Sequence, residues 1–252
     1  MKITFLGTGN AFAPQRDCST ILVNDSILLD AGPGLLVNLK RLAQDPRDVR
    51  YIFISHFHGD HFFGIPFLLL EYAFVSRTDS PLTIVGPAGV EEHVRAVAEL
   101  AFPNLLTPTW PRPLRFVEAH PGVSDTVDDL AFTPVAMRHG QTTAYGYRLT
   151  LPDGVLAYSG DSSMTAALFT LIDGAGVIIL EATSEEESPV HLGQEALRAI
   201  TARIPKESIT FLNHLDTPGD ASWADLPVII PHDLQTFQLD LQTACKPRVN
   251  IV

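Results

Sequence analysis

Short apolar runs alternate along the chain with longer stretches of mixed apolar and polar residues. Most of the short runs hold five to eight residues, the usual length of a β-strand, and they are rich in branched and aromatic side chains. Several longer stretches repeat apolar residues at intervals of three or four, which is typical of an amphipathic helix. We expect strands at 2–6, 20–29, 51–55, 82–86, 114–118, 130–137, 145–150, 155–159, 177–181 and 208–213. We expect helices at 34–43, 62–76, 88–102, 163–172 and 191–203.

This order of elements predicts a mixed α/β domain with strands in the majority. The run 145–150 is joined to 155–159 through Pro152-Asp153-Gly154, a hairpin turn that implies antiparallel pairing at that point. With 252 residues, the chain fits one large domain over 1–252 better than two. The segment near 235–241 would suit either a last core strand or an interface with a second copy, which leaves a homodimer open.

Composition and charge narrow the classes of function. The formal charge of -12 and the pI of about 5.0 work against nonspecific binding of long nucleic acids, which depends on Lys and Arg. The longest apolar stretch contains Pro66 and stops at Glu71, too short to span a membrane. Two cysteines, Cys18 and Cys245, and the absence of an export signal favour the cytoplasm. The net negative charge favours a small-molecule substrate without excluding RNA.

The densest candidate chemistry is the segment Ser55-His-Phe-His-Gly-Asp-His61, which follows an apolar run. If that run is a strand that continues into an extended loop, His56 and His58 point to the same side. Asp60 and His61 then offer a second carboxylate and imidazole nearby. Nitrogen and oxygen donors without a thiolate favour zinc, with manganese and iron as alternatives. The spacing therefore predicts two adjacent divalent metal ions.

Three more ionisable residues stand at the ends of expected strands, where α/β scaffolds tend to place chemistry. They are His139, Asp161 and His214. Each is weak evidence alone, because a histidine after a strand is often structural and an aspartate before a helix is often a cap. Their significance comes from combination with residues 56–61.

Further short motifs extend from one end of the chain to the other. They are Leu6-Gly7-Thr8-Gly9, Leu29-Asp30-Ala31-Gly32-Pro33-Gly34, Ser55–Gly64, Arg138-His139, Tyr158-Ser159-Gly160-Asp161, Glu181-Ala182-Thr183, His191 and His214. With these motifs the chain resembles the metallo-β-lactamase fold superfamily, and within it the branch of ribonuclease Z and small phosphodiesterases. The resemblance implies a four-layer αβ/βα sandwich with metals at one edge of two packed sheets.

The resemblance also implies a ligand set. One metal takes His56, His58 and His139, the other takes Asp60, His61 and His214, and Asp161 bridges the two. Asp30 matches a position that supports the ligands through hydrogen bonds, although a simple turn aspartate before Gly32 would look the same.

A mechanism follows from the resemblance and from general metal chemistry. Two cations can hold a bridging water, lower its pKa and clamp a phosphodiester. Asp60 would orient that nucleophile, His191 would act as general acid, and Glu181 would hold the His191 ring. The alternative for His191 is a solvent-facing residue at the start of a helix, because Ser188-Pro189 precedes it.

Three departures from the ribonuclease Z pattern affect the choice of substrate. His214-Leu215-Asp216 stands where that branch has His-x-Ser, Leu180 replaces a histidine, and only the short loop 103–113 stands where the branch has a long basic arm. The leading prediction is therefore a metal-dependent hydrolase of a small phosphodiester, such as a cyclic phosphate or cyclic nucleotide. A tRNA 3′-end endoribonuclease, a carboxylic ester or lactone hydrolase, and a non-enzymatic binding platform are the alternatives.

Overall fold

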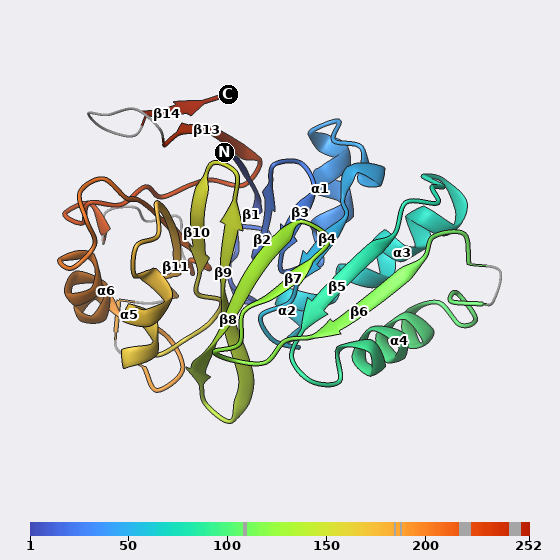
Figure 1. Ribbon diagram of the computed structural model, residues 1–252, viewed down its shortest axis with the longest axis horizontal. Helices are drawn as coiled ribbons and strands as arrows, with labels where there is room; N and C mark the ends of the chain where they lie inside the picture. Colours follow the sequence, from blue (N-terminus) through green and yellow to red (C-terminus); the bar gives the residue numbers. More distant parts are fainter. Residues whose placement is uncertain (108–109, 184, 187, 217–222, 242–247) are drawn as a thin grey trace.

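Two β-sheets pack face to face and carry helices on their outer surfaces (Figure 1). The computed structural model describes residues 1–107, 110–183, 185–186, 188–216, 223–241 and 248–252. The expected loops 103–113 and 216–225 are therefore only partly described, and Cys245 lies outside the described residues. Within the described part, no helix is both long and apolar enough to cross a membrane.

The first sheet has eight strands. In spatial order they are β14 (Arg248–Ile251), β13 (Gln235–Asp240), β1 (Lys2–Gly7), β2 (Thr20–Val23), β3 (Ile27–Leu29), β4 (Tyr51–Phe53), β5 (Leu82–Gly86) and β6 (Leu114–Glu118). Pairing is parallel from β3 to β6 and antiparallel elsewhere in this sheet. Because β13 pairs with β1, the segment near 235–241 is a strand of this sheet.

The second sheet has six strands. Their spatial order is β12 (Ile209–Asn213), β11 (Val177–Glu181), β10 (Gly154–Tyr158), β9 (Thr142–Leu151), β8 (Leu130–His139) and β7 (Asp125–Val127). β10 pairs with β9 antiparallel from Gly154 opposite Leu151, which confirms the hairpin predicted at 152–154. β10, β11 and β12 run parallel, so their carboxyl ends meet at one edge.

Helices cover the outer face of each sheet. Those on the first sheet are α1 (Leu35–Arg41), the short 3₁₀ helix η1 (Pro46–Asp48), α2 (Gly59–Phe62), α3 (Ile65–Phe74) and α4 (Val90–Ala101). Those on the second are α5 (Ala166–Ile172) and α6 (Gln194–Thr201). One apolar core lies between the sheets, and one lies beneath each helical layer. This arrangement confirms the predicted four-layer αβ/βα sandwich.

Local turn chemistry explains where the elements differ from expectation. The run 20–29 is two strands, because Asn24 and Asp25 take left-handed backbone angles (φ 47° and 57°) and reverse the chain. The helix expected at 62–76 is split after Phe62, and α3 begins with Pro66 in its first turn. The strand β7 pairs with β8 across an Asp128 turn (φ 50°) and was not predicted.

Candidate metal centre

Strand ends at one edge of the two sheets deliver the predicted ligands. His56 and His58 lie in the loop after β4, and Asp60 and His61 lie in α2. His139 ends β8, while Asp161 and His214 follow β10 and β12. Most of these side chains are buried, with His56 and His61 fully so. The edge of the sandwich therefore holds a cluster of imidazoles and carboxylates drawn from both sheets.

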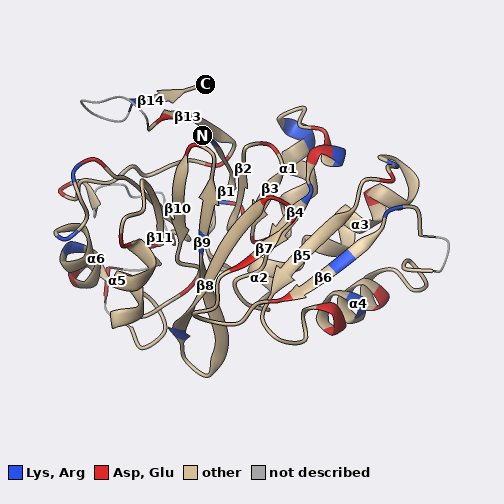
Figure 2. Ribbon diagram, viewed as in Figure 1, with Lys and Arg blue, Asp and Glu red and all other residues tan. Residues whose placement is uncertain are grey.

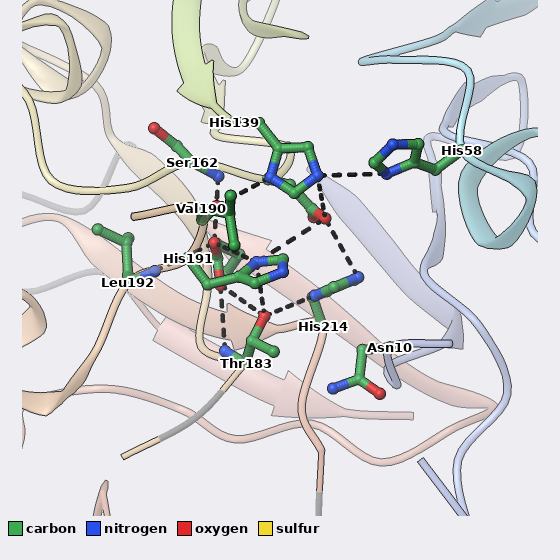
Figure 3. A network of polar contacts seen from close by, with 12 residues as sticks. Asn10, His58, His139, Ser162, Thr183, Val190, His191, Leu192 and His214 are labelled. Atoms are coloured by element: carbon green, nitrogen blue, oxygen red, sulfur yellow. Dashed lines mark hydrogen bonds and ion pairs between the residues drawn. The ribbon is translucent and has the colours of Figure 1, made fainter. Parts of the chain in front are cut away.

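Five groups of three described residues each have donor atoms within 4.8 Å of one another. Two of these triads are His56, His58 and His139, and Asp60, His61 and His214. These are the two groupings that the family resemblance implies. Figure 3 shows His58, His139 and His214 directed toward a common space. The roles of these residues as ligands remain predictions.

Asp161 lies between the triads. Its carboxylate oxygens are 3.8 Å from His139 Nε2 and 3.9 Å from His56 Nε2 on one side. On the other side they are 3.3 Å from His61 Nε2 and 3.5 Å from His214 Nε2. A carboxylate that touches both triads has the position that a bridging ligand requires.

The outer nitrogen of each histidine has an oxygen acceptor that fixes its tautomer. Nδ1 of His61 lies 2.7 Å from Asp30 Oδ2, and Nδ1 of His139 lies 2.8 Å from the Val190 carbonyl. His56 Nδ1 lies 2.9 Å from the Ser55 hydroxyl. When Nδ1 donates, Nε2 presents a lone pair to the cluster, as a metal ligand must. His58 is reversed: its Nδ1 faces His139, and its Nε2 lies 3.3 Å from the Thr142 hydroxyl.

The donor atoms fit a metal centre because several of them have no other partner. Nε2 of His56, Nε2 of His61 and Oδ1 of Asp161 are buried without a hydrogen bond. An unpaired buried polar atom costs roughly 1–3 kcal/mol, and here three such atoms converge. Nitrogen and oxygen donors of this kind suit zinc, manganese or iron. The residues that the resemblance implies as ligands therefore have the burial and the unpaired donor atoms that fit a divalent metal site.

Electrostatics in the cluster follow from burial and close charges. Burial, with the neighbouring His61, lowers the pKa of His56 to about 2, which keeps that imidazole neutral. Burial alone would raise the pKa of Asp161, but the charges of His214 and His61 hold it well below its usual range. Burial opposes ionisation of Asp60 in the same way, and the His214 hydrogen bond still lowers its pKa. The carboxylates are thus ionised and ready to bind cations.

Asp30 supports the cluster from behind. Its fully buried carboxylate accepts hydrogen bonds from Ser55 N (2.7 Å), Ser55 Oγ (2.8 Å), His61 Nδ1 (2.7 Å) and Tyr158 OH (2.6 Å). Burial beside this carboxylate raises the pKa of Tyr158 well above its ordinary value, so the phenol stays a donor. Asp30 therefore joins the β4 loop to β10 and fixes one histidine of the cluster.

Left-handed backbone conformations concentrate at this edge. Asp30 (φ 59°) and His214 (φ 60°) both adopt them, although non-glycine residues seldom do. Gly160 (φ 55°) also does, and a Cβ there would lie 2.6 Å from Ser55 Cβ. Glycine at 160 therefore allows the Asp161 loop to approach the β4 loop closely enough to join the two triads.

A second group of polar contacts surrounds Glu181, at the end of β11. Figure 3 labels two of the residues that contact it, Thr183 and His191. The buried carboxylate of Glu181 lies 3.0 Å from His191 Nδ1 and accepts the Thr183 hydroxyl proton at 2.8 Å. The Thr183 oxygen lies 2.8 Å from His214 Nδ1, so it accepts from that ring. Burial lowers the pKa of His191, but the Glu181 hydrogen bond overrides this and raises it. Thr183 thus connects a predicted metal ligand with the predicted acid pair, a link that sequence reasoning missed.

A cavity of about 490 Å³ opens over the cluster. His58, Asp60, His139, Asp161, His191 and His214 line its floor. Sequence reasoning also missed its rim, which includes Asn10, Phe12 and Thr142. Two other histidines are not among its lining residues: His93 stacks on Phe57 with ring centres 4.0 Å apart, and His120 is exposed.

A four-layer αβ/βα sandwich with this His/Asp cluster at the sheet edge defines the metallo-β-lactamase fold class. The family model described as a beta-lactamase superfamily domain matches residues 25–214, and the chain belongs to that family. Ribonuclease Z of Lacticaseibacillus casei is 34% identical over 157 residues, covering 59% of this chain and 47% of the relative. The chain thus spans about half the length of the curated relatives that it matches.

Solved structures share the fold. Human tRNase Z, short form, superposes with a TM-score of 0.74 at 22% identity, covering 94% of this chain and 99% of that one. A diphosphatase from the PhnP family superposes with a TM-score of 0.71 at 21% identity, covering 94% and 97%. At 21–22% identity these superpositions show a shared fold only. The substrate of this protein has to be argued from its own site.

Proposed function

We propose that this protein is a metal-dependent hydrolase of a small phosphodiester, such as a cyclic phosphate or cyclic nucleotide. The observation that carries the proposal is His191, which faces the cavity with its Nδ1 held 3.0 Å from Glu181. It lies directly beside the cluster, 3.9 Å from Asp161. An imidazole acid placed there can reach the leaving oxygen of a group bound at the cluster.

The chain's residues would divide the chemistry as follows. His56, His58 and His139 would hold one divalent cation, Asp60, His61 and His214 the other, and Asp161 would contact both. When bound, two such cations supply a hydroxide near neutral pH and neutralise the charge of a phosphodiester. Asp60 would accept a hydrogen bond from the attacking water and orient it.

His191 would deliver the proton to the leaving group. Glu181 accepts from Nδ1 and stabilises the imidazolium, so Nε2 can carry the proton toward the departing oxygen. Glu181 is itself held by the Ser162 and Leu192 backbone N–H groups at 3.1 and 3.2 Å. The acid pair is therefore rigid relative to the cluster.

Zinc is the cation that we propose, with manganese and iron as alternatives, because the donors are imidazole and carboxylate. The scarcity of cysteine supports a cytoplasmic protein. A homodimer remains a prediction, and the oligomeric state in solution would test it.

A tRNA 3′-end endoribonuclease is the second candidate, because the curated relatives bear the name ribonuclease Z. The charge of -12 and the short loop at 103–113 weigh against it. Fluorescence anisotropy with labelled tRNA would test it, since a true tRNA enzyme should bind tightly at low salt and lose affinity steeply as salt rises.

Turnover of bis(p-nitrophenyl) phosphate and of an aryl carboxylic ester by zinc-loaded protein tests the leading proposal. His191→Ala should retain bound metal and lower turnover of a 2′,3′-cyclic nucleotide by about 10²- to 10⁴-fold, the usual contribution of a general acid, because its alkoxide leaving group needs a proton. His120→Ala, an exposed histidine away from the cavity, is the matched control. Ester cleavage alone, or cyclic nucleotide cleavage indifferent to His191, would refute the assignment.

A further inference from the structure

The described lining of the cavity over the cluster is unusual for a phosphate site because it lacks Lys and Arg. Arg138 precedes His139 on β8, but alternation along the strand turns it to the opposite face, where it is exposed. Metal ions at the cluster would neutralise the charge of a phosphate bound there. A second phosphate on the substrate would meet no Lys or Arg among the described residues that line the cavity.

The chain on either side of the cavity strengthens this point. The described residues 183, 185–186, 188–191 and 214–216 include or flank residues that line the cavity; they contain no Lys or Arg but include Glu185, Glu186 and Asp216. Figure 2 shows Lys and Arg on α1, α4, α6 and β6, and also at the end of β8, where the exposed Arg138 turns away from the cluster. Such a rim repels polyanions. It favours a substrate whose only negative charge is at the scissile phosphodiester.

Phe12 supplies an apolar surface at the same cavity. Its side chain lines the cavity, yet the residue is 87% exposed. The turn that carries it is fixed: Asn10 Oδ1 accepts from Phe12 N at 2.8 Å, and Asn10 N donates to the Leu215 carbonyl at 3.2 Å. Asn10 itself is buried. An exposed aromatic ring on an anchored turn loses little freedom when it stacks on a ligand.

We infer that Phe12 is a specificity-determining residue, and that its ring stacks on an uncharged aromatic substituent of the phosphodiester, such as an aryl group or a nucleobase. The inference rests on the proposed function, because the cluster must first hold the phosphoryl group. Stacking of this kind tolerates different rings, since every planar ring has a π-face. Phe12 would therefore select for aromatic monoanionic diesters over aliphatic ones and over substrates with further phosphates.

Calorimetric binding of the O-methyl monoesters of phenylphosphonate and methylphosphonate to the zinc-loaded protein tests the inference without turnover. Both probes are monoanions, as a phosphodiester is, and one carries a phenyl ring where the other carries a methyl group. We expect the phenyl probe to bind about 5- to 150-fold more tightly, the range that base–aromatic stacking provides. In Phe12→Ala this preference should fall to near unity, and in Phe12→Tyr it should be retained.

Phe74→Ala is the matched control, because Phe74 is 69% exposed and lines a different cavity; it should leave both affinities unchanged. An unchanged preference in Phe12→Ala would overturn the inference while leaving hydrolysis of bis(p-nitrophenyl) phosphate, and thus the proposed function, intact. Absence of bis(p-nitrophenyl) phosphate hydrolysis by the zinc-loaded wild-type protein would overturn the proposed function, and the inference with it.

Discussion

Asp30→Asn is the sharpest test of how the cluster is supported. Asparagine has nearly the same shape and tolerates the left-handed backbone at this position (φ 59°), so the change removes charge and one acceptor without adding strain. In the wild type, Oδ2 accepts three hydrogen bonds and Oδ1 accepts one, from Ser55 N. If the asparagine amide oxygen replaces Oδ2, its NH₂ group replaces Oδ1 and faces Ser55 N. Two hydrogen-bond donors, the NH₂ group and Ser55 N–H, then face each other at a buried position.

Two opposing effects set the size of the result. A lost hydrogen bond to a charged group costs about 1.5–3 kcal/mol, and the remaining bonds weaken because charge-assisted bonds are roughly twice as strong as neutral ones. Removing a buried charge recovers part of its desolvation cost. Four donors compensate the Asp30 charge, so we expect the first effect to dominate and the unfolding free energy of the metal-free protein to fall by about 2–4 kcal/mol.

Urea unfolding followed by circular dichroism, with a chelator present, measures this change. In a separate titration we expect zinc affinity to fall about 10- to 100-fold, because His61 loses its charged partner. Asp25→Asn is the matched control, since Asp25 is also left-handed (φ 57°) but pairs with Lys2 in a half-exposed position; it should change stability by less than about 1 kcal/mol. Equal stability of the two variants, or stabilisation by Asp30→Asn, would refute the reasoning.

Two further predictions concern the links within the cluster. Asp161→Ala removes the carboxylate that contacts both triads. The metal content measured by mass spectrometry should therefore fall below two ions per chain, while the circular dichroism spectrum stays unchanged. Full retention of both ions would contradict a bridging role. Thr183→Val removes the hydroxyl shared by Glu181 and His214 and should lower zinc affinity about 10- to 100-fold. Thr183→Ser should keep most of the wild-type zinc affinity. Equal zinc affinities of Thr183→Val and Thr183→Ser would show that the hydroxyl does not contribute to metal binding.

Strand positions were predictable where short apolar runs follow a proline or a glycine. The bounds of β5, β6 and β11 agree with expectation, and Pro81, Pro113 and Gly176 precede them. The bounds of β2 and β3 were missed because Asn24-Asp25 was read as part of one long run. Turn residues of that type favour left-handed angles, so the signal was present.

The site was predictable only in part. The grouping of His56, His58, Asp60 and His61 was predictable because they lie within six residues of the chain. The geometry of an extended strand end and a short helix fixes the relative positions of such close neighbours. His139, Asp161 and His214 were candidates as ionisable residues at strand ends. Nothing in a single sequence states which strand ends lie side by side, so their grouping with residues 56–61 came from the family resemblance. Phe12 was missed for the same reason: its place depends on a turn bonded to Leu215, near the other end of the chain.

The division of the cluster between the two sheets has a consequence for folding. More than half of the chain's length separates His56 on the first sheet from His214 on the second. Contacts so distant in sequence form late, because the loop must close before they stabilise anything. Zinc would therefore bind the finished fold and add RT ln(1 + [Zn]/Kd) to its stability. Bound zinc would cross-link the two sheets at the edge where they meet. Its removal would weaken the contact between the sheets before it affects the pairing within either sheet.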